Sequence, residues 1–239
     1  MGILDNATSV GESDPYVRML VYGDPGVGKT VFAAKFPNPF IIDVENGTSS
    51  LLNHEELLGV KKHHLKAFSE MNEIFWDFQA GGGSQYDTIV IDTMNELQTK
   101  HLNEFIDKDK NRDNKLPTML DYKANTAALA RMSIAFRDLP KNLVIVCHST
   151  FDKDDNDGKM YLRPAVTPSL AKTLVGMLDV IGYMYMGLDE ETKEEKRRLQ
   201  IAPSRKVIAK SRIGGLNPIL DDPDPSVFIR KSAKEAVTL

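Results

Sequence analysis

The sequence predicts an α/β domain with a mostly parallel central sheet, helices on its faces and an antiparallel extension at the carboxyl end. Two observations predict this class. Up to about Met177, short runs of apolar and β-branched residues alternate with segments of helical spacing. Beyond that point, three strand-like segments follow one another, at residues 179–186, 197–201 and 206–211. Alternating strands and helices are typical of a parallel sheet, whereas consecutive strands are typical of antiparallel pairing.

The first elements are marked clearly. Residues 16–22 form an apolar run that stops at a glycine, which predicts a strand. Residues 30–36 have helical spacing, and Pro37 and Pro39 end that helix. The run Ile89-Val90-Ile91 is apolar without alternation, as expected for a strand covered on both faces. Further strands are predicted at 40–42, 86–92 and 142–147, and helices at 51–58, 70–78, 95–106, 118–139 and 168–177.

The remaining segments set the expected domain limits. Residues 107–117 are polar and predict a loop, and residues 149–167 predict a long charged loop or a hairpin. The acidic, proline-containing stretch 221–225 resembles a linker. We therefore expect an N-terminal segment at 1–15, one folded domain at 16–216 and a C-terminal tail at 217–239. Phe75, Trp76 and Phe78 are expected to pack in the core.

Composition excludes several classes of protein. The net charge of −4 does not indicate a general affinity for nucleic acid, so any such contact must be local. A single cysteine excludes an internal disulfide framework. No apolar run reaches the roughly 18 residues that a membrane-spanning helix requires, and no signal peptide is recognisable. We expect a cytoplasmic protein with no membrane partner.

A glycine-rich segment lies between the first predicted strand and the first predicted helix, and it matches the pattern G-x-x-x-x-G-K-[ST]. Glycines let the backbone wrap around a phosphate, and amide N–H groups at a helix N-terminus attract it. In this pattern the lysine reaches the β- and γ-phosphates and the hydroxyl binds Mg²⁺. The segment predicts a P-loop NTPase that binds and hydrolyses ATP with Mg²⁺. Its residues are Gly23, Asp24, Pro25, Gly26, Val27, Gly28, Lys29 and Thr30.

A phosphate loop needs a second acid to hold Mg²⁺. Asp92 ends the predicted strand 86–92 and is the best candidate, with Thr93 beside it. The alternative is that Asp92 only caps the following helix.

Hydrolysis also needs a group that positions the attacking water, and Glu45 is the candidate. The carboxyl ends of parallel strands open at one edge of the sheet, so Glu45, Asp92 and the glycine-rich segment are expected to converge there. Asp43 is the competing candidate, and we favour Glu45 because it lies further out. His148 ends a strand at the same edge; it either senses the γ-phosphate or simply caps the strand.

Together these segments resemble the core of RecA-like recombinases. The resemblance covers about residues 15–216, and the spacing is similar to that of small phage-encoded RecA-like ATPases that act as single-strand annealing proteins. Many P-loop NTPases share the phosphate loop. The position of Glu45 and a late Lys-x-Arg pair are what indicate the RecA class. The segments that carry it are Gly23–Thr30, Asp43–Glu45, Tyr86–Asp92, Val144–His148 and Lys210–Arg212.

The resemblance implies roles for several residues. The glutamate matching Glu45 activates water, and a polar residue matching His148 couples the γ-phosphate to a DNA-binding loop; RecA itself has glutamine there, so histidine is a departure. Lys210 and Arg212 would reach a neighbour's γ-phosphate, which implies a filament or ring with composite ATP sites. The alternative is two cations on a solvated strand face. The two DNA-contacting loops would match 107–117 and 149–167, where cations are interspersed with acids: Lys108, Lys110, Arg112, Lys115, Lys153, Lys159 and Arg163.

The function that this resemblance implies is an ATP-dependent, single-stranded DNA-binding recombinase or annealing protein. It would work in the host cytoplasm if phage-encoded, and a single-strand-binding protein would be a further partner. One alternative is an ATPase that loads or remodels a protein partner such as a replicative helicase. A third interpretation is a nucleotide-gated binding module with negligible turnover.

Overall fold

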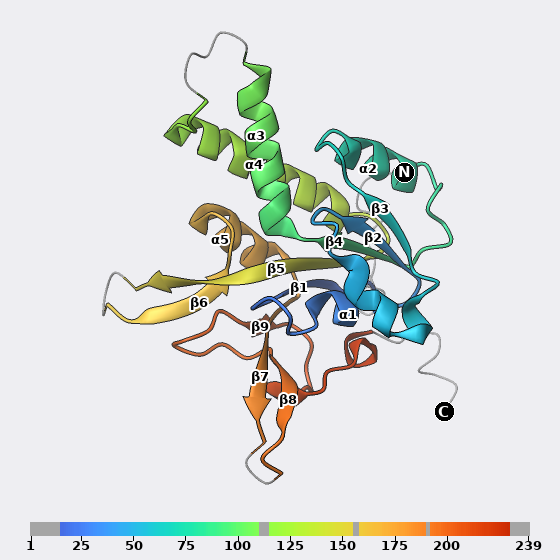
Figure 1. The fold of residues 1–239 in the computed structure, drawn as a ribbon, viewed down its shortest axis with the longest axis vertical. Helices are drawn as coiled ribbons and strands as arrows, with labels where there is room; N and C mark the ends of the chain where they lie inside the picture. The colour runs from blue at the N-terminus through green and yellow to red at the C-terminus, as the bar shows by residue number, and fades with distance from the viewer. Residues whose placement is uncertain (1–14, 110–114, 155–157, 190–191, 230–239) are drawn as a thin grey trace, which may run out of the picture.

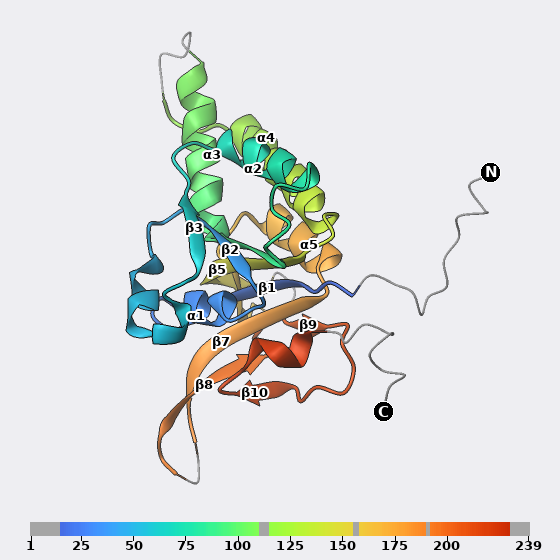
Figure 2. The ribbon, with the colours of Figure 1, turned by 90° about the vertical axis from the view of Figure 1, so that its right-hand side faces the viewer.

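The computed structural model describes residues 15–109, 115–154, 158–189 and 192–229. Its centre is a ten-stranded sheet with helices packed on its faces (Figures 1 and 2). The strand order is β10-β8-β7-β1-β5-β4-β2-β3, with β6 paired to β5 and β9 paired to β7. The predicted α/β class, with a mostly parallel central sheet and an antiparallel extension, is confirmed.

The strands and helices have the following bounds. The strands are β1 (Arg18–Gly23), β2 (Pro39–Asp43), β3 (Lys61–His64), β4 (Thr88–Asp92), β5 (Asn142–Lys153), β6 (Met160–Pro164), β7 (Val180–Leu188), β8 (Glu195–Gln200), β9 (Lys210–Ser211) and β10 (Ile219–Asp221). The α-helices are α1 (Lys29–Ala34), α2 (Glu70–Gln79), α3 (Met94–Lys108), α4 (Met119–Arg137) and α5 (Pro168–Met177). The short 3₁₀ helices are η3 (Thr48–Asn53), η4 (Glu55–Leu57) and η5 (Pro225–Phe228).

The central parallel strands β1, β4 and β5 are buried on both faces where they pair, because alternate side chains enter two separate cores. On β1, Leu20 and Tyr22 belong to the core under α2, α3, α4 and α5. Met19 and Val21 point the other way, into the core under α1 and the 3₁₀ helices. β1 lies between β5 and β7 and pairs with both in parallel. The carboxyl ends of these strands therefore open at one edge of the sheet.

The antiparallel extension begins after β7. β8 and β9 pair antiparallel with β7, and β10 pairs antiparallel with β8. The stretch expected to be a linker instead ends β10 and starts η5. Phe228 is fully buried, with its ring centroid 6.2 Å from that of Phe32 on α1. Residues 219–229 thus pack on the domain, while 1–14 and 230–239 lie outside the described residues.

Several local expectations were wrong. The predicted helix 51–58 is two 3₁₀ helices separated by His54, whose extended backbone breaks the helical path, although Leu51 and Leu57 are buried as helical spacing implies. β3 was missed because it is a polar edge strand with no apolar run. Trp76 is 65% exposed rather than packed in the core. Of the two alternatives for residues 149–167, the hairpin is confirmed, because β5 and β6 pair antiparallel from Ser149 to Pro164.

No helix of the described segments combines the length and the apolar character needed to cross a lipid bilayer.

Candidate nucleotide-binding site

The glycine-rich segment connects the carboxyl end of β1 to the start of α1. Gly23 is the last residue of β1, and a Cβ there would lie 2.1 Å from the carbonyl oxygen of Met184 on β7. Gly28 has a φ of 91°, in the left-handed region that favours glycine, and it immediately precedes α1. The backbone therefore turns tightly at the helix N-terminus, as a phosphate-binding loop requires.

Lys29 lies buried at the base of this loop. Its ammonium donates hydrogen bonds to the carbonyl oxygens of Gly23, at 2.9 Å, and Asp24, at 2.7 Å. Burial lowers the pKa of Lys29, and the negative charges of Asp92 and Glu45 oppose that effect. The lysine is thus a buried, pre-positioned cation that an anionic phosphate group can bind.

Asp92 and Thr30 meet beside the loop. Asp92 ends β4, and its Oδ2 accepts a hydrogen bond of 2.7 Å from the Thr30 hydroxyl. Asp92 is 4% exposed, and its second oxygen, Oδ1, is buried without a hydrogen-bond partner among the described residues. Burial raises the pKa of Asp92 to about 6, and repulsion from Glu45 and Asp43 adds to the effect, while the Thr30 hydrogen bond opposes it.

These residues fit a hydrated Mg²⁺ ion. A buried carboxylate oxygen without a partner is costly unless a cation or a donor satisfies it, and carboxylate and hydroxyl oxygens suit Mg²⁺. Thr30 and Asp92 are the residues that would hold the ion, directly or through water. When bound, Mg²⁺ would supply positive charge that neutralises negative charge on the nucleotide phosphates.

Glu45 faces the same cavity from the segment after β2. Its Oε1 accepts hydrogen bonds from the Thr93 hydroxyl, at 3.0 Å, and pairs with His148 Nε2 at 2.8 Å. Asp43, the competing candidate, is turned away from the cavity. Its carboxylate is 1% exposed and is bonded to Lys62, Thr48 and the backbone of Gly47.

β5 links the site to the hairpin beyond it. His148 lies on β5 beside Gly23, its register partner on β1. The next residue, Ser149, donates its hydroxyl to the carboxylate of Asp24 in the phosphate loop. The same strand continues to Lys153 and pairs with β6 from Ser149 onward. A single strand therefore runs from the phosphate loop into the hairpin.

Lys210 and Arg212 lie elsewhere. Lys210 donates to the carbonyl of Val175, and Arg212 donates to the carbonyl of Gly176 at 2.9 Å, so both contact the last turn of α5. Arg212 also lies 3.3 Å from the carboxylate of Asp179. Such contacts are favourable because the carbonyl end of a helix carries partial negative charge. The structure does not bring these two cations into the nucleotide site of their own chain.

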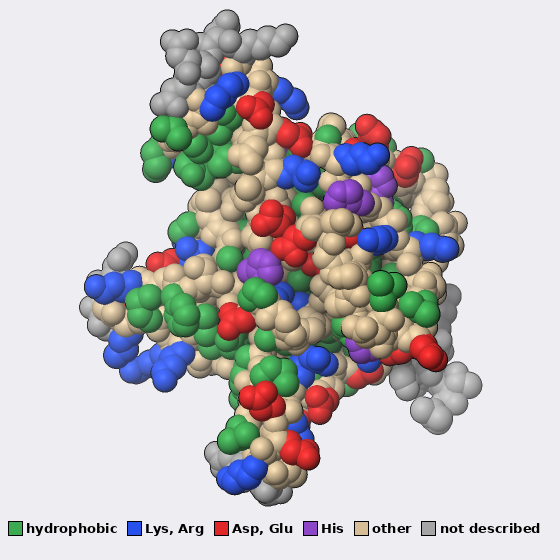
Figure 3. Space-filling view, in the orientation of Figure 1, with side chains coloured by type: hydrophobic (Ala, Val, Ile, Leu, Met, Phe, Trp, Pro, Cys, Tyr) green, Lys and Arg blue, Asp and Glu red, His purple; other side chains and the backbone are tan. Residues whose placement is uncertain are grey.

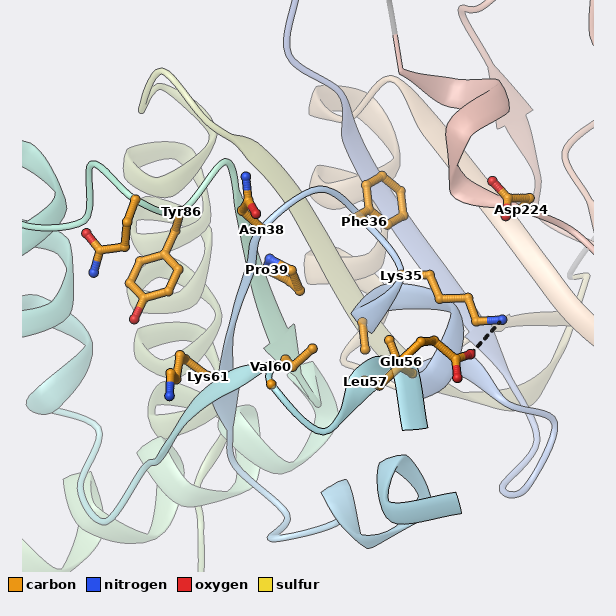
Figure 4. A pocket seen from close by; sticks show the side chains of 13 residues that line it. Lys35, Phe36, Asn38, Pro39, Glu56, Leu57, Val60, Lys61, Tyr86 and Asp224 are labelled. Atoms are coloured by element: carbon orange, nitrogen blue, oxygen red, sulfur yellow. Dashed lines mark ion pairs between the residues drawn. The ribbon is translucent and has the colours of Figure 1, made fainter. Parts of the chain in front are cut away.

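The site residues line one cavity of about 370 Å³. Glu45, Asp92 and His148 line it together with residues of the phosphate loop, so the structure brings these predicted site residues together. The loop residues that line it are Pro25, Gly26, Gly28, Lys29 and Thr30. A larger cavity of about 560 Å³ lies at the opposite edge of the sheet, where β2 and β3 begin, and is lined by Lys35, Glu56 and Tyr86 (Figure 4). It contains none of the phosphate-binding residues.

Sequence reasoning missed Arg197. This residue comes from β8, far along the chain, yet its Nε donates a hydrogen bond of 2.7 Å to the carbonyl oxygen of Val27 in the phosphate loop. It also lines the cavity. The only signal in the sequence is a run of three cations, Lys196-Arg197-Arg198, and this run does not reveal which of them faces the loop.

The fold and the site define a P-loop NTPase: a phosphate loop between a strand and a helix, with a hydroxyl and a second acid beside it. The comparison with protein families agrees, because the model of the AAA domain matches residues 16–213. The chain belongs to this family of P-loop ATPases. The search of curated proteins finds no match.

Proposed function

We propose that this protein is an ATP-dependent, single-stranded DNA-binding recombinase or annealing protein of the phage-encoded RecA-like type, which hydrolyses ATP with Mg²⁺. The observation that carries the proposal is the path of β5. His148 contacts the proposed water-positioning glutamate, Ser149 contacts the phosphate loop, and the strand then forms an exposed hairpin. A change at the γ-phosphate can therefore be transmitted to the hairpin through two adjacent residues.

The surface of the hairpin suits a single-stranded nucleic acid. Phe151 is 65% exposed and Lys153 follows two residues later, so both side chains lie on one face of β5. Exposed aromatic rings stack on bases, and neighbouring cations bind phosphates. Hydrophobic and basic side chains lie side by side at this end of the molecule (Figure 3). Arg163 does not contribute, because it is bonded to Asp152 and to two backbone carbonyls.

Two further cations, which are distant from the hairpin in sequence, lie next to it in the fold. The backbone nitrogen of Leu162 on β6 donates to the carbonyl of Lys206, at 2.7 Å, which holds residues 204–207 against the hairpin. Arg205 and Lys206 are exposed. They supply positive charge next to β6, the partner strand of β5, and we propose that they give the DNA surface a basic side. Of the first predicted loop, residues 110–114 with Lys110 and Arg112 lie outside the described residues.

The proposed reaction assigns one task to each residue of the site. Lys29 binds the phosphates, and Thr30 and Asp92 would hold Mg²⁺. Glu45 orients the attacking water, which requires its carboxylate to loosen its contact with His148. Lys210 and Arg212 would act on a neighbour's nucleotide in a filament or ring, since they do not face their own. A single-strand-binding protein is a further proposed partner.

The test is ATP hydrolysis with and without single-stranded DNA, at a stated low salt concentration because phosphate contacts weaken steeply with salt. We expect stimulation by DNA, and we expect it to fall in Phe151→Ala and in the double variant Arg205→Ala/Lys206→Ala. Lys61→Ala, an exposed cation on β3, is the matched control. Equal rates with and without DNA across low salt would refute the proposal.

The trans role of Arg212 has a separate test. Arg212→Ala and Glu45→Gln should each be inactive alone, and mixing them should restore part of the ATPase rate if each supplies what the other lacks at a shared interface. An arginine finger contributes roughly 10³–10⁵ in rate, so recovery would be easy to detect. If mixing restored no activity, the proposed trans role would be refuted, and the contacts with α5 would be the role of Arg212.

A different function is favoured by one other observation. Leu116, Met119 and Leu120, next to and at the start of α4, are 68%, 74% and 74% exposed. Hydrophobic side chains gather at this outer end of α4 (Figure 3). Exposed apolar groups of this kind mark protein contacts. An ATPase that loads a protein partner such as a helicase would use this surface, and the partner rather than DNA would stimulate it.

A further inference from the structure

Arg197 presses its guanidinium group against the phosphate loop. The atoms Nε, Cζ and Nη2 lie 2.6, 2.7 and 2.7 Å from the position that a Cβ on Gly28 would occupy. Glycine at position 28 therefore serves two purposes: it permits the positive φ and it leaves room for the arginine. β8 carries Arg197 here because β7, its partner strand, runs alongside β1 and then continues past Gly23.

The two neighbouring cations on β8 have a different environment. Lys196 pairs with Asp189 at 2.6 Å, and Arg198 pairs with Asp221 at 2.9 Å. Arg197 has no such carboxylate partner in the described part of the chain. Only its Nε is bonded there, to the carbonyl of Val27, so Nη1 and Nη2 remain as donors that no described residue accepts from. This partly exposed cation lines the cavity of Lys29 and Asp92.

The position of these donors indicates what they bind. Backbone N–H groups of a phosphate loop hold the α- and β-phosphates, and Arg197 lies beside Gly28 in that part of the loop. A guanidinium group presents a planar fork of donors that matches phosphate oxygens. We propose that Arg197 binds the α- and β-phosphates of the nucleotide held by its own chain, as a phosphate ligand supplied by the antiparallel extension. This proposal requires nucleotide binding at the loop but does not require DNA.

The experiment measures binding without DNA. A fluorescent ADP analogue is titrated into the full chain and displaced by ADP, ATP or inorganic pyrophosphate, at constant Mg²⁺. Charged hydrogen bonds contribute about 1.5–3 kcal/mol, so Arg197→Met should weaken ADP, ATP and pyrophosphate alike by about ten- to a hundredfold. The controls Lys196→Met and Arg198→Met remove surface ion pairs and should change affinity by less than about threefold.

Three results would overturn the proposal. Unchanged affinity for all three ligands would show that Arg197 does not contact the nucleotide. Weaker ADP with unchanged pyrophosphate would place Arg197 at the base or the ribose. The third result would show a purely structural role for Arg197, and it is tested with Arg197→Gln. The glutamine amide can still donate to Val27 but carries no charge. Wild-type pyrophosphate affinity in that variant would show that Arg197 only supports the loop, whereas we expect Gln to bind as weakly as Met.

Discussion

Replacing Asp92 by asparagine should make the nucleotide-free protein more stable. Asp92 is buried, and one of its oxygens has no hydrogen-bond partner among the described residues. Burial raises its pKa from 3.8 to about 6. One pKa unit corresponds to about 1.4 kcal/mol, so ionised Asp92 lowers the free energy of unfolding by roughly 3 kcal/mol at neutral pH. Asparagine removes the charge and can still accept the hydrogen bond from Thr30.

The pH dependence has a defined sign. A carboxyl group whose pKa is raised in the folded state binds more protons when folded, so stability falls as pH rises between about 4 and 6. Above this window ionised Asp92 lowers the free energy of unfolding by the full amount of roughly 3 kcal/mol. At pH 5 this destabilisation is about half as large. The stability advantage of Asp92→Asn should therefore be larger at pH 7.5 than at pH 5.

Urea unfolding followed by circular dichroism measures this advantage at the two pH values. Asp43→Asn is the matched control, because Asp43 is the register partner of Asp92 on β2 and is equally buried. Its carboxylate is bonded to Lys62 and Thr48, so this variant should instead lose about 1–3 kcal/mol. Mg²⁺ with ADP should stabilise the wild type and stabilise Asp92→Asn much less.

The reasoning would be refuted if nucleotide-free Asp92→Asn were no more stable than the wild type at pH 7.5. An advantage that did not shrink at pH 5 would also contradict it, because the gain would then not come from the charge.

Three further predictions concern other parts of the domain. Lys29→Ala should abolish ATP and ADP binding in a fluorescence titration; retained affinity would show that the loop binds phosphate without its cation. Glu45→Gln should bind ATP normally but hydrolyse it roughly 10²–10⁴ times more slowly in single-turnover assays, and an unchanged rate would exclude it as the water-positioning group. Phe228→Ala should lower the free energy of unfolding by about 3–5 kcal/mol, whereas the exposed neighbour Val227→Ala should change it little. Equal effects in urea unfolding would argue against the packing of η5.

The parallel half of the domain could be predicted from local sequence. Residues 88–92 and 142–147 are continuous apolar runs, and burial on both faces of a parallel strand requires such runs. The phosphate loop was recognisable because its glycines, lysine and hydroxyl occupy fixed positions. Once the strands are parallel, their carboxyl ends share one edge, so the convergence of Glu45, Asp92 and the loop followed from order along the chain alone.

Edge elements were harder to predict because their pairing does not depend on apolar side chains. β3 is polar and is held by backbone hydrogen bonds to β2. β10, at the other edge, is only three residues long, too short to show a pattern of its own, and it pairs with β8. The prolines and acids after it obscured the burial of Phe228. The composition of a segment indicates whether solvent surrounds it. These segments are instead ordered by pairing and packing with residues distant in the chain.

The sequence by itself determined the fold class, the phosphate loop and the acids that accompany it, because periodicity and motif spacing are local properties of the chain. Only the tertiary structure decided that Arg197 faces the loop while Lys196 and Arg198 pair with acids, and that Lys210 and Arg212 contact α5. Strand pairing fixes the direction in which each of these cations points, and pairing depends on residues far apart in sequence. The sequence identifies the charged residues, but the fold determines which group each of them contacts.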